Sequence, residues 1–180
     1  QSKIPLLEKN AAPAESVALL EQIEKGLGNI PNIFKAMAHS PTALGTYLAL
    51  SGELKKSSLS PRLAESIALA VAQATGCRYC LSAHTVIGRL SGLSDEEMMA
   101  ARTGQPADAK ERAAVALARE MVQTHGNVSE AARQAARAAG LSEREQLDVL
   151  VAVVLNLFTN FFNHYADTPI DFPKAPNLPQ

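Results

Sequence analysis

Residues 60–93 read SPRLAESIALAVAQATGCRYCLSAHTVIGRLSGL, and this stretch decides the fold class. Ser60 and Pro61 are typical of a helix start, because serine caps free backbone amides and proline suits the first helical position. An apolar helix follows and breaks at Gly76. A second helix begins around the two cysteines and runs to Ser91, where Gly92 is a natural left-handed terminator. The stretch therefore predicts two consecutive helices.

The rest of the chain repeats this pattern, with apolar residues at three- and four-residue spacing between Gly, Pro and Ser punctuation. Three helix starts are typical of capping boxes: Ser94 with Glu97, Asp108 with Glu111, and Ser142 with Glu145. Further helices are expected at 14–26, from Pro31, from Pro41 to Leu54, and at 95–103, 109–124, 129–139 and 143–165.

We therefore expect an all-α fold, a helical bundle of about eight helices that forms one domain over residues 1–180. Strand signals are scarce, and no linker divides the chain. From about residue 166 onward, prolines at 169, 173, 176 and 179 predict an extended tail, because proline cannot sit inside a regular helix.

Charge and hydropathy exclude several classes of partner. The chain has 17 basic and 18 acidic side chains, so it lacks the basic surface that nucleic acid binding needs. Its longest apolar run, residues 147–162, is broken by Asp148, Asn156 and Asn160, and a membrane span needs roughly 20 mostly apolar residues. We interpret this run as a buried helix. The first ten residues do not resemble a secretory signal, and we expect a cytoplasmic protein.

The two cysteines lie three positions apart, at Cys77 and Cys80. A secreted disulfide scaffold needs more cysteines, spread along the chain. A bridge that closes so short a loop also restricts the unfolded chain very little. The pair therefore indicates a redox function or a metal site rather than a structural disulfide.

On one helix, Cys77, Cys80 and His84 point within about 60° of one another. An imidazole beside a thiol favours a thiolate near neutral pH. The helix N-terminus favours the thiolate of Cys77, whereas the histidine favours that of Cys80. We give the histidine more weight, because a positioned base also moves protons.

Glu65 interrupts the apolar helix before the cysteines. A carboxylate buried there would need a partner, and a nearby imidazole could supply one and form a proton relay. Composition alone favours the alternative, an exposed face of an amphipathic helix, because Glu is seldom buried.

A zinc site is the main alternative for these four residues. Structural zinc sites draw two ligand pairs from separate segments, whereas Cys77, Cys80 and His84 lie on consecutive turns of one helix. A thioredoxin-like protein is also excluded, because no βαβ pattern surrounds the motif. We therefore favour redox chemistry over metal binding and expect neither a metal nor an organic cofactor. A non-enzymatic redox sensor stays open.

Polar side chains also interrupt the last apolar helix, at Asn156, Asn160, Asn163 and His164. They could line the cleft or a subunit contact. Hydrogen-bonded core or interface groups are the more common outcome for such residues.

The spacing of Glu65, Cys77, Cys80 and His84 resembles the signature E-x11-C-x-x-C-x3-H of alkylhydroperoxidase D-like proteins, members of the carboxymuconolactone decarboxylase superfamily. The segments 28–32, 161–165 and 171–173 are similar to the peroxidase-related branch of that family, so the likeness spans most of the chain.

This resemblance implies an all-α homo-oligomer, a trimer or hexamer, that reduces hydroperoxides with an external thiol or dithiol reductant. It implies Cys80 as the peroxidatic nucleophile, Cys77 as the resolving thiol, and His84 with Glu65 as the proton relay. True lactone decarboxylases lack the cysteine pair. Some members carry a histidine where this chain has Tyr79, which helical geometry points away from the thiols, so we interpret Tyr79 as a packing residue.

Overall fold

The computed structural model describes residues 2–178, and within that range it contains helices and no strand. In chain order, the elements are the 3-10 helix Lys9–Ala11, α1 (Ala14–Leu27), α2 (Asn32–Met37), α3 (Pro41–Leu54), α4 (Pro61–Thr75), α5 (Arg78–Leu90), α6 (Asp95–Thr103), α7 (Ala109–Gln123), α8 (Glu130–Ala138) and α9 (Glu143–Ala166). The all-α prediction is confirmed, with nine α-helices in the described range where about eight were expected.

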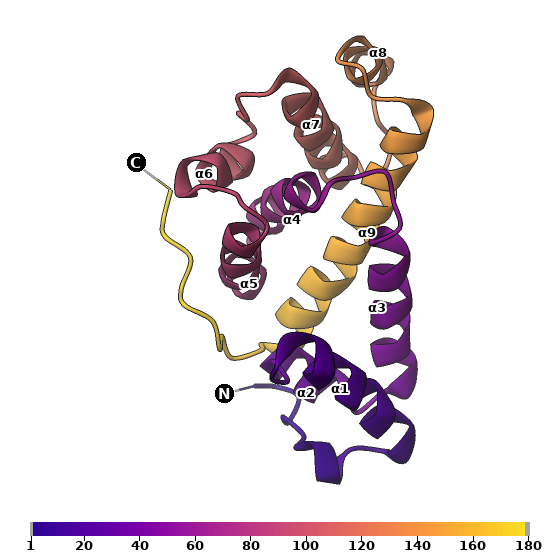
Figure 1. The fold of residues 1–180 in the computed structure, drawn as a ribbon, viewed down its shortest axis with the longest axis vertical. Coiled ribbons are helices and arrows are strands. Elements are labelled where there is room, and N and C mark those ends of the chain that lie inside the picture. Colours follow the sequence, from indigo (N-terminus) through magenta and orange to yellow (C-terminus); the bar gives the residue numbers. More distant parts are fainter. Residues whose placement is uncertain (1, 179–180) are drawn as a thin grey trace.

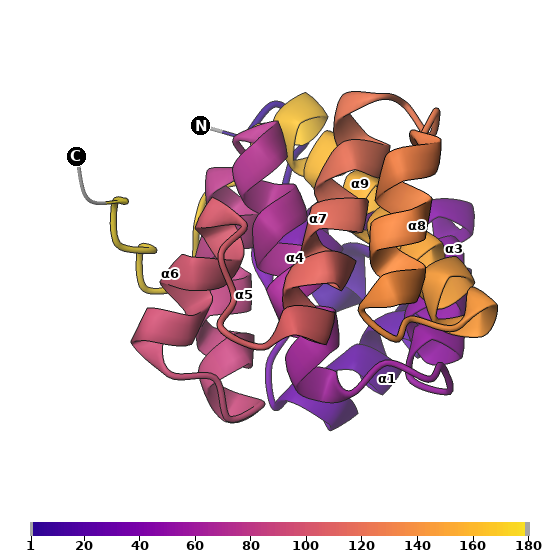
Figure 2. The ribbon, with the colours of Figure 1, turned by 90° about the horizontal axis from the view of Figure 1, so that it is seen from above.

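Helix α4 lies at the centre of the fold and packs against α5, α6, α7 and α9 (Figures 1 and 2). Residues 66–72 of α4 are all buried, because a helix that is apolar on nearly every side must be surrounded by other elements. Figure 2 shows α5 and α6 on one side of α4, and α7 and α8 on the other. The cysteine-bearing helix α5 is therefore held directly against the central helix of the fold.

Helix α9 is the longest helix and runs diagonally across the molecule (Figure 1). Within residues 2–178, α9 is also the one helix long and apolar enough to cross a membrane by length and composition. Half of its most apolar window is buried, and α9 packs against α3, α4, α5 and α7. It therefore packs as a core helix, with one face left exposed.

Capping side chains fix the helix starts as predicted in most cases. Complete capping boxes are present at the starts of α6, with Ser94 and Glu97, and α9, with Ser142 and Glu145. The box predicted at the start of α7 is only half correct. Asp108 caps the amide of Glu111 at 2.8 Å, but the Glu111 carboxylate accepts a hydrogen bond from Ser66 on α4 instead of turning back.

The segment after α9 has no helix in residues 167–178, as predicted, and it runs along α5 and α6 (Figure 1). Several contacts attach it to the rest of the protein. The Phe172 ring stands edge-on to Tyr79 with ring centroids 5.6 Å apart, the Ala175 amide donates to the Ser82 hydroxyl at 3.2 Å, and Arg102 donates to the Pro176 carbonyl at 2.7 Å.

Candidate active site

The turn between α4 and α5 positions the cysteine pair. Gly76 ends α4 with a φ of 71°, a left-handed conformation that glycine adopts without steric cost. The chain then reverses so that the Cys77 amide donates to the Ala72 carbonyl at 2.9 Å. Cys77 is the N-cap of α5, and its Sγ accepts a hydrogen bond from the Cys80 amide at 3.3 Å.

Cys77 and Cys80 are joined by a disulfide, with their Cα atoms 5.3 Å apart. The two residues are 1% and 3% exposed, so the pair lies in the core and not on an open surface. The prediction that both sulfurs face the same side of α5 is confirmed, because the bridge needs that geometry. Such a pair can store two electrons as a dithiol and release them as a disulfide.

Glu65 on α4 and His84 on α5 meet across the interface between these helices. The Glu65 Oε2 and His84 Nδ1 atoms are 2.7 Å apart, and the two side chains are only 16% and 19% exposed. The expectation from composition, an exposed Glu65, is therefore wrong. Packing of α5 on α4 supplies the partner that makes burial of this carboxylate tolerable.

The pairing also selects the protonation pattern of the imidazole. Because a carboxylate can only accept, Nδ1–H of His84 donates to Glu65, which leaves Nε2 as the ring nitrogen able to act as a base. Within residues 2–178, His84 makes no hydrogen bond to either sulfur. The structure thus brings His84 and Glu65 together as predicted, whereas direct contact between His84 and Cys80 stays a prediction.

Two further residues lie beside the candidate site. The sequence marked Asn163 only as one of the polar residues in an apolar helix, and it did not mark Tyr47. Asn163 on α9 donates from Nδ2 to Cys80 Sγ at 3.3 Å. Tyr47 on α3 lies near Glu65, and its pKa is raised, mainly by burial and additionally by the negative charge of Glu65. Tyr47 is therefore a neutral phenol over the physiological pH range.

Tyr79 points into the protein, and the interpretation of this residue as a packing group is confirmed. Its hydroxyl donates to Asp171 at 2.8 Å and accepts from the Ile33 amide at 3.2 Å. Burial is the main reason that the pKa of Tyr79 is strongly raised. Asp171 also accepts from the Asn32 amide at 2.7 Å, so one hydrogen-bonded group connects α5, α2 and the C-terminal segment.

The three asparagines of α9 are buried, as the more common outcome predicted, whereas His164 is not. Asn156 is buried and donates to the Ala152 carbonyl at 2.8 Å, and the buried Asn160 accepts from the Thr75 hydroxyl. His164 is exposed, with Nε2 3.1 Å from the Thr75 carbonyl.

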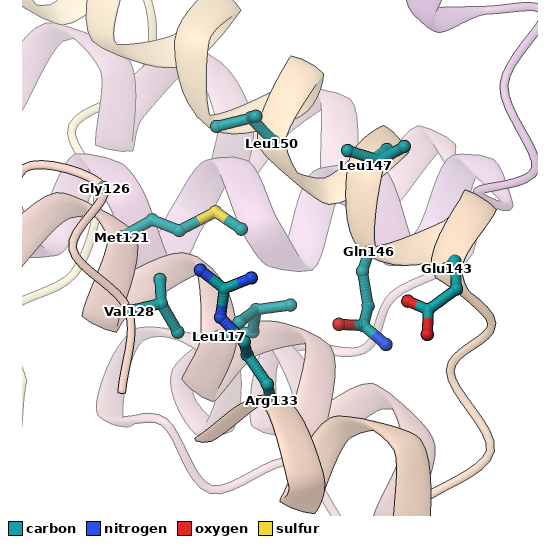
Figure 3. A pocket seen from close by; sticks show the side chains of 9 residues that line it. All are labelled: Leu117, Met121, Gly126, Val128, Arg133, Glu143, Gln146, Leu147 and Leu150. Carbon is teal, nitrogen blue, oxygen red and sulfur yellow. The ribbon is translucent and has the colours of Figure 1, made fainter. Parts of the chain in front are cut away.

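The four candidate residues do not form a metal cage. Within residues 2–178, no three His, Cys, Asp or Glu side chains are grouped as ligands. A separate pocket of about 260 Å³ lies between α7, α8 and α9 (Figure 3). Its lining is mainly apolar, with the Arg133 guanidinium among Met121 and Leu150, and it includes none of the four candidate residues.

Comparisons with known proteins agree with this arrangement. Residues 41–120, which contain all four candidate residues, match the model of the Carboxymuconolactone decarboxylase family. No curated protein matches the sequence.

Solved structures with a similar fold include the following three. A peroxidase-related protein from Ralstonia eutropha JMP134, described as an alkylhydroperoxidase AhpD core, has a TM-score of 0.84 and 21% identity, covering 94% of this chain and 92% of that chain. A peroxidase-related protein from Silicibacter sp. TM1040 has a TM-score of 0.80 and 25% identity, with 93% and 89% covered. The debrominase Bmp8 has a TM-score of 0.80 and 22% identity, with 95% and 93% covered.

Proposed function

We propose that this chain is a thiol peroxidase acting on organic hydroperoxides. Residues 41–120 match the model of the Carboxymuconolactone decarboxylase family, and the chain has the alkylhydroperoxidase D-like fold. One observation supports this most strongly. A buried pair of cysteines, close enough to form a disulfide, lies one helical turn before a histidine that is itself held by a carboxylate. This combination supplies a nucleophile, a resolving thiol and a base.

In the proposed reaction, His84 takes the proton of the Cys80 thiol through Nε2. The thiolate attacks the distal oxygen of ROOH, so that an S–O bond forms and the O–O bond breaks. The alkoxide leaves with the electron pair and takes the proton from His84, which gives ROH and a Cys80 sulfenic acid. Glu65 stabilises the positive imidazolium between these steps.

The Cys77 thiol then attacks the sulfenic sulfur, an S–S bond forms, and water leaves. An external thiol or dithiol reduces the disulfide by exchange and is itself oxidised. This cycle needs a compartment that keeps such reductants available, which fits the expected cytoplasmic location. The apolar surroundings of the cysteines favour organic hydroperoxides over hydrogen peroxide as substrates.

Homo-oligomerisation is part of this proposal. The exposed apolar side chains Leu147, Val154 and Phe161 of α9 are spaced seven residues apart and therefore follow one stripe. We propose that a second copy of the chain covers it. Light scattering on the purified protein should give the mass of a trimer or hexamer, and the mass of one chain would contradict the assembly.

The test of the peroxidase proposal is a paired assay. Loss of cumene hydroperoxide is followed with dithiothreitol as reductant, and free thiols are counted before and after one equivalent of peroxide. We expect loss of two thiols together with sustained turnover. Loss of thiols without turnover would instead indicate a redox sensor or exchange module, and no loss of either would refute redox chemistry.

Two substitutions assign the cysteines. Cys80→Ser should reduce peroxide consumption to the rate of buffer with dithiothreitol. Cys77→Ser should consume one equivalent and leave a sulfenic acid that dimedone traps on Cys80. Full activity of the Cys80 variant would show that the nucleophile is wrongly assigned.

A parallel assay with 2,3,4-tribromopyrrole, the compound bound to a variant of the debrominase Bmp8, tests whether bromide release competes with peroxide reduction.

A further inference from the structure

Cys80 has a polar partner on a distant part of the chain. The Asn163 amide Nδ2 donates to Cys80 Sγ at 3.3 Å, although the two residues are 83 positions apart. Asn163 is 6% exposed and lies near the end of α9, which packs against α5. The sulfur of the proposed nucleophile therefore receives a hydrogen bond that no residue of its own helix provides.

The rest of the Asn163 side chain has no partner. Its Oδ1 atom is buried and has no hydrogen-bond partner within residues 2–178. Two other buried polar atoms there also have none, the donor Asn160 Nδ2 and the Thr168 hydroxyl. A buried polar atom without a partner destabilises a protein, whereas an apolar side chain of similar size avoids that penalty. Protein stability is thus a poor explanation for an amide at this position.

We infer that Asn163 is a positioning residue that stabilises the thiolate form of Cys80. An N–H donor binds an anionic sulfur more strongly than a neutral thiol or a disulfide, since the hydrogen bond becomes charge-assisted. Asn163 acts only on Cys80, because the Cys77 sulfur receives its hydrogen bond from the Cys80 amide. The inference rests on the proposed function.

The hydrogen bond from Asn163 also determines which sulfur of the disulfide the reductant attacks. When a thiolate of the reducing dithiol attacks the disulfide, one sulfur is bonded and the other leaves with the electron pair. The better stabilised thiolate is the better leaving group. Asn163 therefore directs the reductant to Cys77: a mixed disulfide forms there, Cys80 leaves as a thiolate, and the second thiol of the reductant releases Cys77 as the reductant becomes a disulfide.

The test isolates each thiol. Cys77→Ser leaves Cys80 as the only cysteine, and serine is a favoured helix cap, so α5 keeps its start. The absorbance of the thiolate at 240 nm is followed against pH in this background, with and without Asn163→Leu. We expect Asn163→Leu to move the midpoint of thiolate formation upward by about one pH unit or more.

Asn156→Leu is the matched control. Asn156 is also buried on α9, but its side chain donates to the Ala152 carbonyl of its own helix. Its replacement should leave the midpoint unchanged. Asn163→Leu in the Cys80→Ser background, where Cys77 is the only thiol, should also leave the midpoint unchanged. Asn163→Ala, a substitution that favours helix, replaces Asn163→Leu if the larger side chain prevents folding.

An unchanged midpoint for Cys80, or an equal shift in the two single-thiol backgrounds, would overturn the inference. The measurement uses reduced protein without peroxide. A chain that forms thiolate as expected but consumes no peroxide would therefore refute the proposed peroxidase function and leave the role of Asn163 standing.

Discussion

Glu65→Gln tests whether the contact between α4 and α5 assists the chemistry. The substitution keeps the size of the side chain and leaves an amide oxygen that can still accept from His84 Nδ1, so the 2.7 Å contact can persist. It removes the negative charge. Any loss of rate therefore reports the charge of Glu65 rather than the packing of the two helices.

The magnitude follows from the geometry of the pair. In the proposed reaction His84 becomes positive when it takes the Cys80 proton, and a charge-assisted hydrogen bond is worth about 1.5–3 kcal/mol against about 0.5–1.5 kcal/mol for a neutral one. The two side chains are mostly buried, so solvent screens the pair only partly. A loss of about 1–2 kcal/mol corresponds to a rate roughly 5- to 30-fold lower.

The assay is a single-turnover reaction of the reduced protein with cumene hydroperoxide, read as the rate of disulfide formation. Glu111→Gln is a matched control, because that carboxylate is hydrogen-bonded to Ser66 on another side of α4. Glu111→Gln should leave the rate within about twofold of that of the wild-type protein, an effect of less than about 0.5 kcal/mol.

A double-mutant cycle provides the decisive comparison. If Glu65 acts through His84, Glu65→Gln should cost little further rate in a His84→Gln background, because the two effects are not additive. Equal losses in both backgrounds, or a Glu65→Gln protein as fast as the Glu111→Gln control, would refute the proton relay.

Three further predictions concern stability. Tyr79→Phe removes the hydrogen bonds to Asp171 and the Ile33 amide, and we expect a loss of about 1–3 kcal/mol in the free energy of unfolding by urea. The pKa of Tyr79 is raised in the folded protein, so near pH 10 its hydroxyl ionises only in the unfolded chain. The free energy of unfolding should therefore fall above that pH. In thermal scans, this fall should be shallower for Tyr79→Phe. The pKa of Glu145 is lowered to about 2, mainly by Lys110 and then by Ser142. Its contribution to stability is therefore complete above about pH 4.5 and is lost as the pH falls toward 2. Glu145→Gln should remove this part of the acid destabilisation; if urea titrations show the same dependence of stability on pH between these values, the prediction is contradicted.

Helix positions could be predicted from the sequence because their determinants are local. The serine caps of α4, α6 and α9 lie within three residues of the amides they bind, and Gly76 acts only on its own turn. In the capping box expected at Asp108, the hydrogen bond from the cap amide back to Glu111 is missing, because a distant residue competes for that carboxylate. Glu111 found a partner, Ser66, 45 residues away on a helix that packs beside it.

By itself, the sequence determined the all-helical fold, the start of α5 around the two cysteines, and the closeness of Cys77 and Cys80, since residues three apart on a helix share a face. Only the tertiary structure decided the environment of these sulfurs. Glu65 is buried because α5 covers it with His84, and Cys80 is hydrogen-bonded because the end of α9 brings Asn163 to it from 83 residues away. Such partners depend on how the helices pack, and no spacing along the chain encodes that arrangement directly.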